Sequence, residues 1–366
     1  MKTLLKEVGS GLLIGIANII PGVSGGTFLL ILGMYQRVMS AISGLSIATV
    51  REMSGHVFGI VLSSRRKTHL TAFIDLIVKN DLFFLMKIGF GAVAAIVILS
   101  DVMMYLLTKQ FPATYAFFFG LIVVSTLLSM RLVEKFNFTR VLILVLGIVA
   151  TVGITVAVNP ADKARTKSEH YREQYEQQQS SAVHTDVSAV DTKNRLFTGE
   201  YTPGEYVGGV LGGALGVSAM VLPGLSGSLV LILTGQYYKV LNAISSLRTL
   251  KLEHFLFLML FGAGMVIGVL LFARLVTFVF KRYYNGTIAF LTGLMAGSLY
   301  TLWPFKSTVT MDQYVKGNEG ISLIRDVMVR TNINVLPDGF GEVAVVLISC
   351  VIGAGIMLLL GKYTRE

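Results

Sequence analysis

The stretch NIIPGVSGGTFLLILGMY, residues 18–35, places one proline and four glycines inside an otherwise apolar segment. A second stretch, MVLPGLSGSLVLILTGQY at residues 220–237, repeats most of this pattern in register. Proline removes a backbone hydrogen bond from a helix, and glycine admits backbone conformations that other residues avoid. Both stretches therefore predict a helix that breaks within an apolar segment and then resumes.

The composition indicates an integral membrane protein. Of the 366 residues, 54% are hydrophobic and 14% are charged, whereas about a quarter of the residues in soluble domains are charged. The net charge of +10 lies mainly in short loops between apolar segments. This placement favours membrane topology and anionic lipid headgroups over nucleic acid as its explanation. The single cysteine lies in an apolar run, so we expect no disulfide, no metal centre and no cofactor.

Hydropathy divides the chain into eight apolar segments, which are residues 11–45, 83–107, 115–130, 141–158, 206–245, 255–279, 287–303 and 342–360. A bilayer core about 30 Å thick requires about 20 helical residues to cross it. The segments 11–45 and 206–245 exceed one straight helix, but each half of a broken segment is too short to span. We predict a re-entrant hairpin in each, whose two half-helices enter and return on the same side. The alternative is one kinked, tilted span followed by an amphipathic tail.

The repeat extends beyond the broken segments, because TYAFFFGLIVVS at 114–125 matches TIAFLTGLMAGS at 287–298. Each half then holds one hairpin and three simple spans. Since three is odd, the second half must enter the membrane from the opposite face. The expected fold is an all-α integral membrane protein with two inverted repeats, residues 1–158 and 206–366.

Polar segments complete the expected topology. Residues 159–205 are rich in glutamine, serine and charge, and we interpret them as an extracytoplasmic linker with a helical piece near Ser168–Gln179. Residues 46–82 form a basic, partly amphipathic segment that we expect on the inner membrane surface. The distribution of lysine and arginine favours both termini in the cytoplasm.

The breaks predict an anion site. Unwound backbone at membrane depth is tolerated only where protein buries it or where it lines a wet cavity. A half-helix that starts after the break presents unpaired N–H groups and a positive dipole end, for which phosphate is a natural ligand. The hydroxyls around the two termini are those of Ser24, Thr27, Ser226 and Ser228. Close packing of helices through small residues is the alternative interpretation of these glycines.

The stretches IANIIPGVSGGTFLLILGMY (16–35), MVLPGLSGSLVLILTGQY (220–237) and AFLTGLMAGSLYTLWPF (289–305) resemble the PopT family of bacterial polyprenyl-phosphate transporters. The resemblance covers nearly the whole chain except residues 159–205. It implies that the chain returns undecaprenyl phosphate, the lipid carrier of cell-wall building blocks, from the outer to the cytoplasmic leaflet of the bacterial inner membrane. The phosphate-binding positions carried over are Asn18, Pro21, Gly22, Ser24, Gly25, Gly26, Thr27, Pro223, Gly224, Ser226, Gly227 and Ser228. The second stretch has methionine where the first has Asn18, which suggests unequal roles for the two breaks.

Four charged residues are further candidates for substrate contact or coupling. Asp101 and Arg274 occupy equivalent positions inside apolar segments, where ionisable groups are costly and often functional. Arg274 could hold a phosphate and Asp101 could carry a coupling proton, but both could also reach toward headgroups from a helix end. Arg37 and Lys239 follow their serines by about 20 Å of helix, where contact with lipid phosphate and simple exposure to headgroups are equally compatible.

Two other functions remain to be compared with lipid transport. A channel or transporter for a small soluble anion could use the same helix termini. A membrane-embedded lipid phosphatase would need a nucleophile and a general acid, and no histidine or acidic cluster supplies them, so we expect no enzyme activity. The expected partners are a polyprenyl-phosphate lipid and surrounding membrane lipids. A coupling proton or sodium ion and a homodimer are left open.

Overall fold

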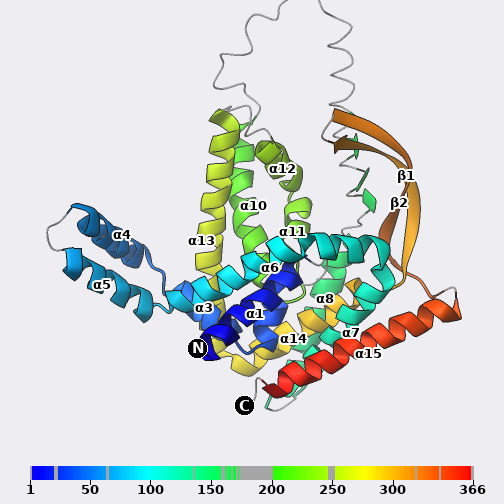
Figure 1. The fold of residues 1–366 in the computed structure, drawn as a ribbon, viewed down its shortest axis with the longest axis horizontal. Helices are drawn as coiled ribbons and strands as arrows, with labels where there is room; N and C mark the ends of the chain where they lie inside the picture. Colours follow the sequence, from blue (N-terminus) through cyan, green and yellow to red (C-terminus); the bar gives the residue numbers. More distant parts are fainter. Residues whose placement is uncertain are drawn as a thin grey trace, which may run out of the picture.

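The computed structural model describes residues 2–19, 24–62, 66–134, 137–157, 201–245, 252–317, 320–337 and 339–363, with isolated positions between 161 and 172. Most of these residues are helical (Figure 1). Within the described parts, six helices are long and apolar enough to cross a membrane. The chain is therefore a mostly helical, multi-pass membrane protein.

The helices coincide with most of the apolar segments expected from the sequence. Two differ as candidate spans: helix Tyr284–Thr301, at the predicted span 287–303, is not among the six, whereas helix Pro203–Val221, predicted as half of a hairpin, is among them. Before the linker, they are α1 (Lys2–Ile19), α2 (Gly25–Ile31), α3 (Tyr35–Ser43), α4 (Ile47–Leu62), α5 (Arg66–Lys79), α6 (Leu82–Lys109), α7 (Phe111–Met130) and α8 (Phe138–Ala157). After the linker, they are α10 (Pro203–Val221), α11 (Gly227–Leu233), α12 (Tyr237–Ser245), α13 (Leu252–Arg282), α14 (Tyr284–Thr301) and α15 (Phe340–Tyr363). The six candidate spans lie in α6, α7, α8, α10, α13 and α15.

The same three-helix unit occurs at the start of the chain and after the linker. The first helices, α1 and α10, have 18 and 19 residues, the second helices have seven each and the third have nine each. The short second helix folds back beside the first, because Gly25 packs against α1 and Gly227 against α10. The turn before each third helix contains a glycine with positive φ, Gly33 and Gly235. In each broken segment, which we call a hairpin below, a short second helix thus packs beside the first. Re-entry into the membrane on the same side stays a prediction.

Each hairpin packs against a long helix through matching contacts. α6 lies along α1, and α13 lies along α10. Gly11 of α1 approaches the carbonyl oxygen of Ile88 so closely that a Cβ atom would collide with it. The equivalent close approaches join Gly91 to Val8, Gly213 to Phe261 and Gly264 to Val210. The corresponding positions of the two helix pairs therefore make the same contacts.

The remaining helices form two pairs, and each pair takes one helix from either side of the linker. α7 packs with α15, and α8 packs with α14. Gly120 of α7 lies against the carbonyl oxygen of Cys350 in α15. The equivalent approaches join Gly353 to Phe117, Gly293 to Leu144 and Gly147 to Phe290. The α7–α15 and α8–α14 pairs therefore join the part of the chain before the linker to the part after it through close backbone contacts.

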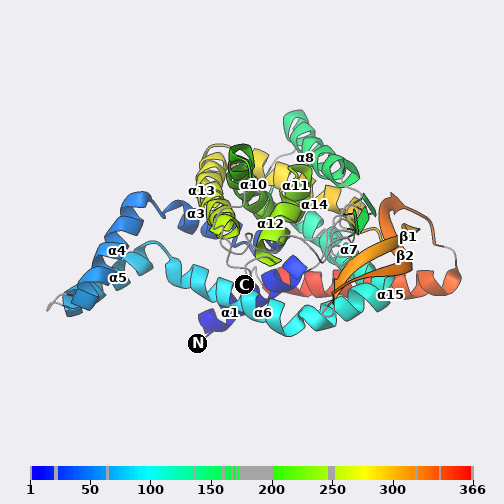
Figure 2. The same ribbon diagram turned by 90° about the horizontal axis from the view of Figure 1, so that it is seen from above.

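α7 and α14 supply much of the buried core. Figure 2 shows α14 between α13 and α8, and α14 contacts both of these helices. Its residues Leu291, Leu294 and Met295 are at most 2% exposed. The outer helices α8, α13 and α15 instead expose many large apolar side chains. Such surfaces suit lipid contact, since lipid tails are as apolar as leucine.

Helices α4 and α5 form a pair that stands apart from the main bundle (Figure 1). This pair occupies the basic segment that we expect on the inner membrane surface, and that location stays a prediction. Most of the polar linker lies outside the described residues, including most of the helical piece expected near its start.

An antiparallel β-ribbon follows α14, and the all-α prediction leaves it out. Strand β1 (Lys306–Gly317) pairs with β2 (Gly320–Asn334), and Thr310 lies opposite Met328. β1 contains threonine and valine and β2 contains isoleucine and valine, and these β-branched residues favour extended structure. That signal is present in the sequence but is weaker than the hydropathy of the neighbouring spans. The all-α class therefore holds for the apolar segments and fails for this ribbon.

Candidate functional site

The first break separates α1 from α2. Residues 20–23, which include Pro21 and Gly22, lie outside the described residues. Ser24 precedes α2 with extended backbone (φ −118°, ψ 147°) and occupies its N-cap position. The side-chain oxygen of Asn18 accepts a 2.9 Å hydrogen bond from the N–H of Gly25. Asn18 thus satisfies one of the N–H groups at the start of α2, which helix geometry alone leaves without a partner.

The second break is described throughout. α10 ends at Val221, and the chain then turns at Pro223 and Gly224. Gly224 has φ +77°, a left-handed conformation that glycine adopts readily. Ser226 precedes α11 with extended backbone (φ −104°, ψ 126°), and its hydroxyl lies 2.9 Å from that of Ser228. Both breaks therefore place a serine at the N-cap position of a seven-residue helix.

The two breaks contact each other directly. The hydroxyl of Ser24 donates a 2.7 Å hydrogen bond to the carbonyl oxygen of Leu222. The N–H of Gly224 donates a 3.1 Å hydrogen bond to the hydroxyl of Thr27. Gly26 packs against the carbonyl oxygen of Val221, with no room for a side chain between them. Two side chains at the start of α2 therefore satisfy backbone groups of the second break.

The two breaks differ in exposure. Ser24 is 3% exposed and Thr27 is 1% exposed, and both hydroxyls bond to the other break. Ser226, Gly227 and Ser228 are only partly buried. The Ser226–Ser228 pair is therefore more exposed than the Ser24–Thr27 pair.

Residues 14–320 match the family described as undecaprenyl phosphate translocase-like. The chain belongs to this family. A relative named polyprenyl-phosphate transporter, from Vibrio cholerae, is 29% identical over 310 residues, which cover 85% of this chain and 80% of the relative. A second relative with that name, from Staphylococcus aureus, is 25% identical over 296 residues, which cover 80% of this chain and 84% of the relative. No solved structure matches.

In this translocase-like chain, Arg37 belongs to an ion-pair cluster. Its guanidinium bonds to both carboxylate oxygens of Asp81, with distances of 2.5 and 2.8 Å, and to Glu7 at 3.1 Å. The ammonium group of Lys87 binds the other oxygen of Glu7 at 2.9 Å. Arg37 also lies 3.7 Å from the ring centroid of Phe84. The cluster joins α1, α3 and α6, which gives Arg37 a structural role that its spacing from Ser24 does not reveal.

Lys239 makes the corresponding contact after the linker. Its ammonium group lies 2.8 Å from a carboxylate oxygen of Glu205, in the first turn of α10. Each hairpin thus carries an ion pair from its third helix to its first. Because both cations are held by carboxylates, neither Arg37 nor Lys239 is a strong candidate for binding lipid phosphate.

We expect Arg37→Met to lower the free energy of unfolding by about 2 kcal/mol, because the buried Glu7 carboxylate would keep only one cationic partner. Thermal unfolding of the purified protein in detergent measures the change. Arg51→Met, at an exposed position of α4, is the control and should change stability by less than about 0.5 kcal/mol. Equal unfolding temperatures for the two variants would show that the cluster does not stabilise the hairpin.

The structure does not bring Asp101 or Arg274 to the breaks. Asp101 on α6 and Arg274 on α13 are both exposed. Exposure on the outer surface of a membrane helix fits side chains that reach toward headgroups. Their proposed roles in coupling or phosphate contact therefore remain predictions without support from their position.

The base of the β-ribbon contains two cations that the sequence identified only as loop charges. Lys306 donates hydrogen bonds to the carbonyl oxygen of Tyr300 and to the side-chain oxygen of Asn334. Burial lowers the pKa of Lys306 to about 8. Arg330 lies 4.0 Å from the ring centroid of Phe111, at the start of α7. No motif marks these residues, because the ribbon alone brings them to the helix ends.

Proposed function

We propose that this chain transports undecaprenyl phosphate from the outer to the cytoplasmic leaflet of the bacterial plasma membrane by alternating access. The observation that carries the proposal is the direct contact between the two breaks, Ser24 with Leu222 and Gly224 with Thr27. Two irregular segments that meet inside the protein are the arrangement in which unwound backbone survives at membrane depth. The family match and the names of both relatives support a lipid phosphate as the transported molecule.

The arrangement of the ends supports an inverted repeat. Figure 1 places the N-terminus and the C-terminus near each other, at the end of the molecule from which α1 starts. α10 starts instead beside the start of α13, on the side of the bundle away from the termini (Figure 1). Each hairpin then enters from its own face, as residues 1–158 and 206–366 require if they are inverted copies. The matched glycine contacts support the same division.

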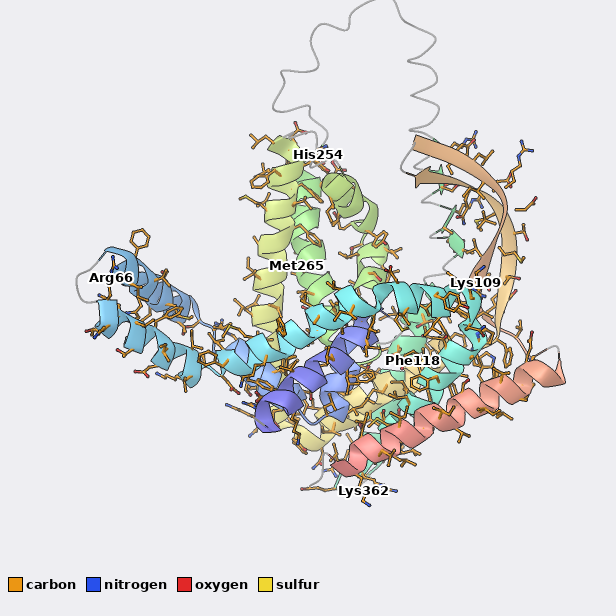
Figure 3. The ribbon with its side chains drawn as sticks, viewed as in Figure 1. Arg66, Lys109, Phe118, His254, Met265 and Lys362 are labelled. Carbon is orange, nitrogen blue, oxygen red and sulfur yellow. The ribbon has the colours of Figure 1, made fainter. Side chains whose placement is uncertain are left out.

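Charge supports cytoplasmic termini. Lys362 lies at the lower end of α15, whereas Lys109 and His254 lie at the opposite side of the bundle (Figure 3). The end with the termini carries the larger share of the lysine and arginine residues in short loops. Positively charged loops remain in the cytoplasm during insertion. The linker and the β-ribbon then lie outside.

The unequal packing of the two hairpins supports alternating access. α3 packs on α13, where the ring centroid of Tyr35 lies 5.8 Å from that of Phe280. In the described part of the chain, α12 has no comparable packing on α6, the corresponding helix. Tyr35 is 1% exposed, whereas Tyr237, its counterpart on α12, is only partly buried. In this proposal, the first hairpin is closed, with α3 packed on α13, and the second hairpin is open. In the opposite conformation, the first hairpin would be open and the second closed.

The headgroup site in this proposal consists of the two N-cap serines and the residues around them. The phosphate binds the Ser226–Ser228 pair while α12 is open, and the Ser24–Thr27 pair becomes available when α3 releases α13. The prenyl chain stays in the lipid. This scheme needs no chemical step by the protein, so we propose transport without catalysis. The coupling ion and the oligomeric state are left open.

A vesicle assay tests the proposal. Purified protein is reconstituted into liposomes that contain undecaprenyl phosphate, and added phosphatase reports the fraction of the lipid in the outer leaflet. We expect Ser226→Leu to reduce transfer between leaflets to the protein-free level, because an apolar side chain would fill the headgroup position. Thr234→Leu, at an exposed position at the end of α11, is the control and should transport normally.

Transfer at the wild-type rate by Ser226→Leu would remove the site assignment. Transfer of inorganic phosphate or sulfate instead of the lipid would favour a small-anion transporter. Release of phosphate without added phosphatase would indicate an enzyme.

A further inference from the structure

A cavity of about 740 Å³ lies where the start of α8, the end of α13 and the start of α14 meet. Three of its lining residues are cationic, Arg140 from α8 and the consecutive Lys281 and Arg282 from α13. Among the described residues, no aspartate or glutamate lines it. The cavity is therefore electropositive and suited to an anion.

Polar and aromatic groups lie beside these cations. Asn285 contacts Glu134, with its side-chain oxygen 3.3 Å from the N–H of Glu134 and its amide nitrogen 3.4 Å from the carboxylate. Glu134 is not among the described residues that line the cavity. Asn137 accepts a 3.0 Å hydrogen bond from the N–H of Arg140 and begins α8. The guanidinium of Arg282 lies 5.9 Å from the ring centroid of Tyr283.

The rest of the lining is apolar and continues onto the outer surface of the helices. Ile143, Val279 and Phe290 line the cavity beside the cations. Outside it, the neighbouring parts of α8 and α13 expose large apolar side chains, among them Leu142, Leu146, Leu275 and Phe278. A charged pocket that continues into an apolar surface is matched to an amphiphile and not to a free ion.

Comparison of the two parts of the chain shows that these charges are not required for packing. α7 and α15 reproduce the glycine contacts of α14 and α8. Lys109, the last residue of α6, corresponds to Arg282, the last residue of α13. The residue before it is Thr108, where α13 has Lys281. The same glycine contacts therefore form in a pair of helices whose neighbour, α6, ends with one cation where α13 ends with two.

We propose that this cavity binds the phosphate headgroup of a membrane lipid, whose hydrocarbon chain lies on the exposed surface of α8 and α13. The lysine and arginine side chains supply charge-assisted hydrogen bonds to phosphate oxygens. The site is separate from the breaks: Gly224 packs near Ser298, about 16 Å along α14 from Thr287 at the cavity, at 1.5 Å per residue. If the lipid is undecaprenyl phosphate, the inference rests on the proposed function and the cavity is a station on the substrate's path. If it is a phospholipid, the site is independent of transport.

Native mass spectrometry of the full chain in detergent tests the proposal. The probes are undecaprenyl phosphate, phosphatidylglycerol and inorganic phosphate, each added alone and in competition. We expect the double variant Lys281→Gln/Arg282→Gln to bind at least one of the two lipids about tenfold more weakly or worse, because it removes two charged partners. Lys109→Gln, at the corresponding corner of the other pair of helices, should bind as wild type.

A second variant removes space and keeps every charge. A Cβ atom on Gly286 would meet only the side chain of Ile143, at 3.6 Å, so Gly286→Leu should fill the cavity without straining the backbone. We expect the same loss of lipid binding with an unchanged unfolding temperature. This result separates loss of a site from general damage to the fold.

Each outcome decides the matter. Loss of undecaprenyl phosphate binding alone identifies a substrate station, and loss of phosphatidylglycerol binding supports a phospholipid site. Wild-type binding of both lipids by the charge variant and by Gly286→Leu would overturn the proposal. Displacement of the lipids by equimolar inorganic phosphate would also overturn it, since the ligand would then be a free ion. A wild-type protein that binds lipid but fails the vesicle assay would refute the proposed transport and leave this site standing.

Discussion

We expect Gly26→Ala to reduce transfer of undecaprenyl phosphate between vesicle leaflets to the protein-free level and to destabilise the protein by about 1–3 kcal/mol. Gly26 is buried against the carbonyl oxygen of Val221, and a Cβ atom on residue 26 would collide with that oxygen. The added methyl group must push the two breaks apart. The hydrogen bonds from Ser24 to Leu222 and from Gly224 to Thr27 would then lengthen or break.

Gly9→Ala is the matched control for this substitution. Gly9 lies in the same hairpin, within α1, and a Cβ atom there would have no neighbour within 4 Å. Alanine also has a higher helix propensity than glycine, so this variant should be at least as stable as wild type and transport normally. Normal transport by Gly26→Ala would show that close contact between the breaks is not needed for function.

Gly224→Ala should have the second large effect, a destabilisation of about 3 kcal/mol together with loss of transport. Two costs combine there. The left-handed conformation with φ +77° costs a residue with a Cβ atom about 1–2 kcal/mol. The Cβ atom would also collide with the carbonyl oxygen of Leu294 in α14, which adds the cost of overpacking.

Gly235→Ala separates these two costs. Gly235 has a similar φ of +68°, but a Cβ atom there would have nothing within 4 Å. We expect this variant to lose only about 1 kcal/mol and to retain transport. Chemical or thermal unfolding in detergent, followed by the vesicle assay, compares the pair. Equal losses for the two variants would show that the contact with α14 contributes nothing.

The positions of the helices could be predicted because apolar length and backbone breakers act locally. Pro21 and Pro223 mark both breaks, and the spans follow from runs of apolar residues. The role of Arg37 could not be predicted in this way. Its partners Glu7 and Asp81 come from α1 and from the turn before α6, and no spacing rule brings them together. The same limit applies to Arg330, which the β-ribbon carries to the start of α7. Lys306 follows α14 closely in the sequence, but its partner Asn334 comes from the end of β2.

The sequence by itself determined that this is a membrane protein with two similar broken helices, because hydropathy, proline and glycine act on the chain where they stand. It also pointed to the family and to the serines around each break. Only the tertiary structure decided that the breaks touch and that Ser24 and Thr27 are buried while Ser226 and Ser228 are partly exposed. It also decided that Arg140 of α8 lines the same cavity as Lys281 and Arg282 of α13. Those facts depend on which helices pack together, and packing between distant segments is set by the shape and burial of the whole chain.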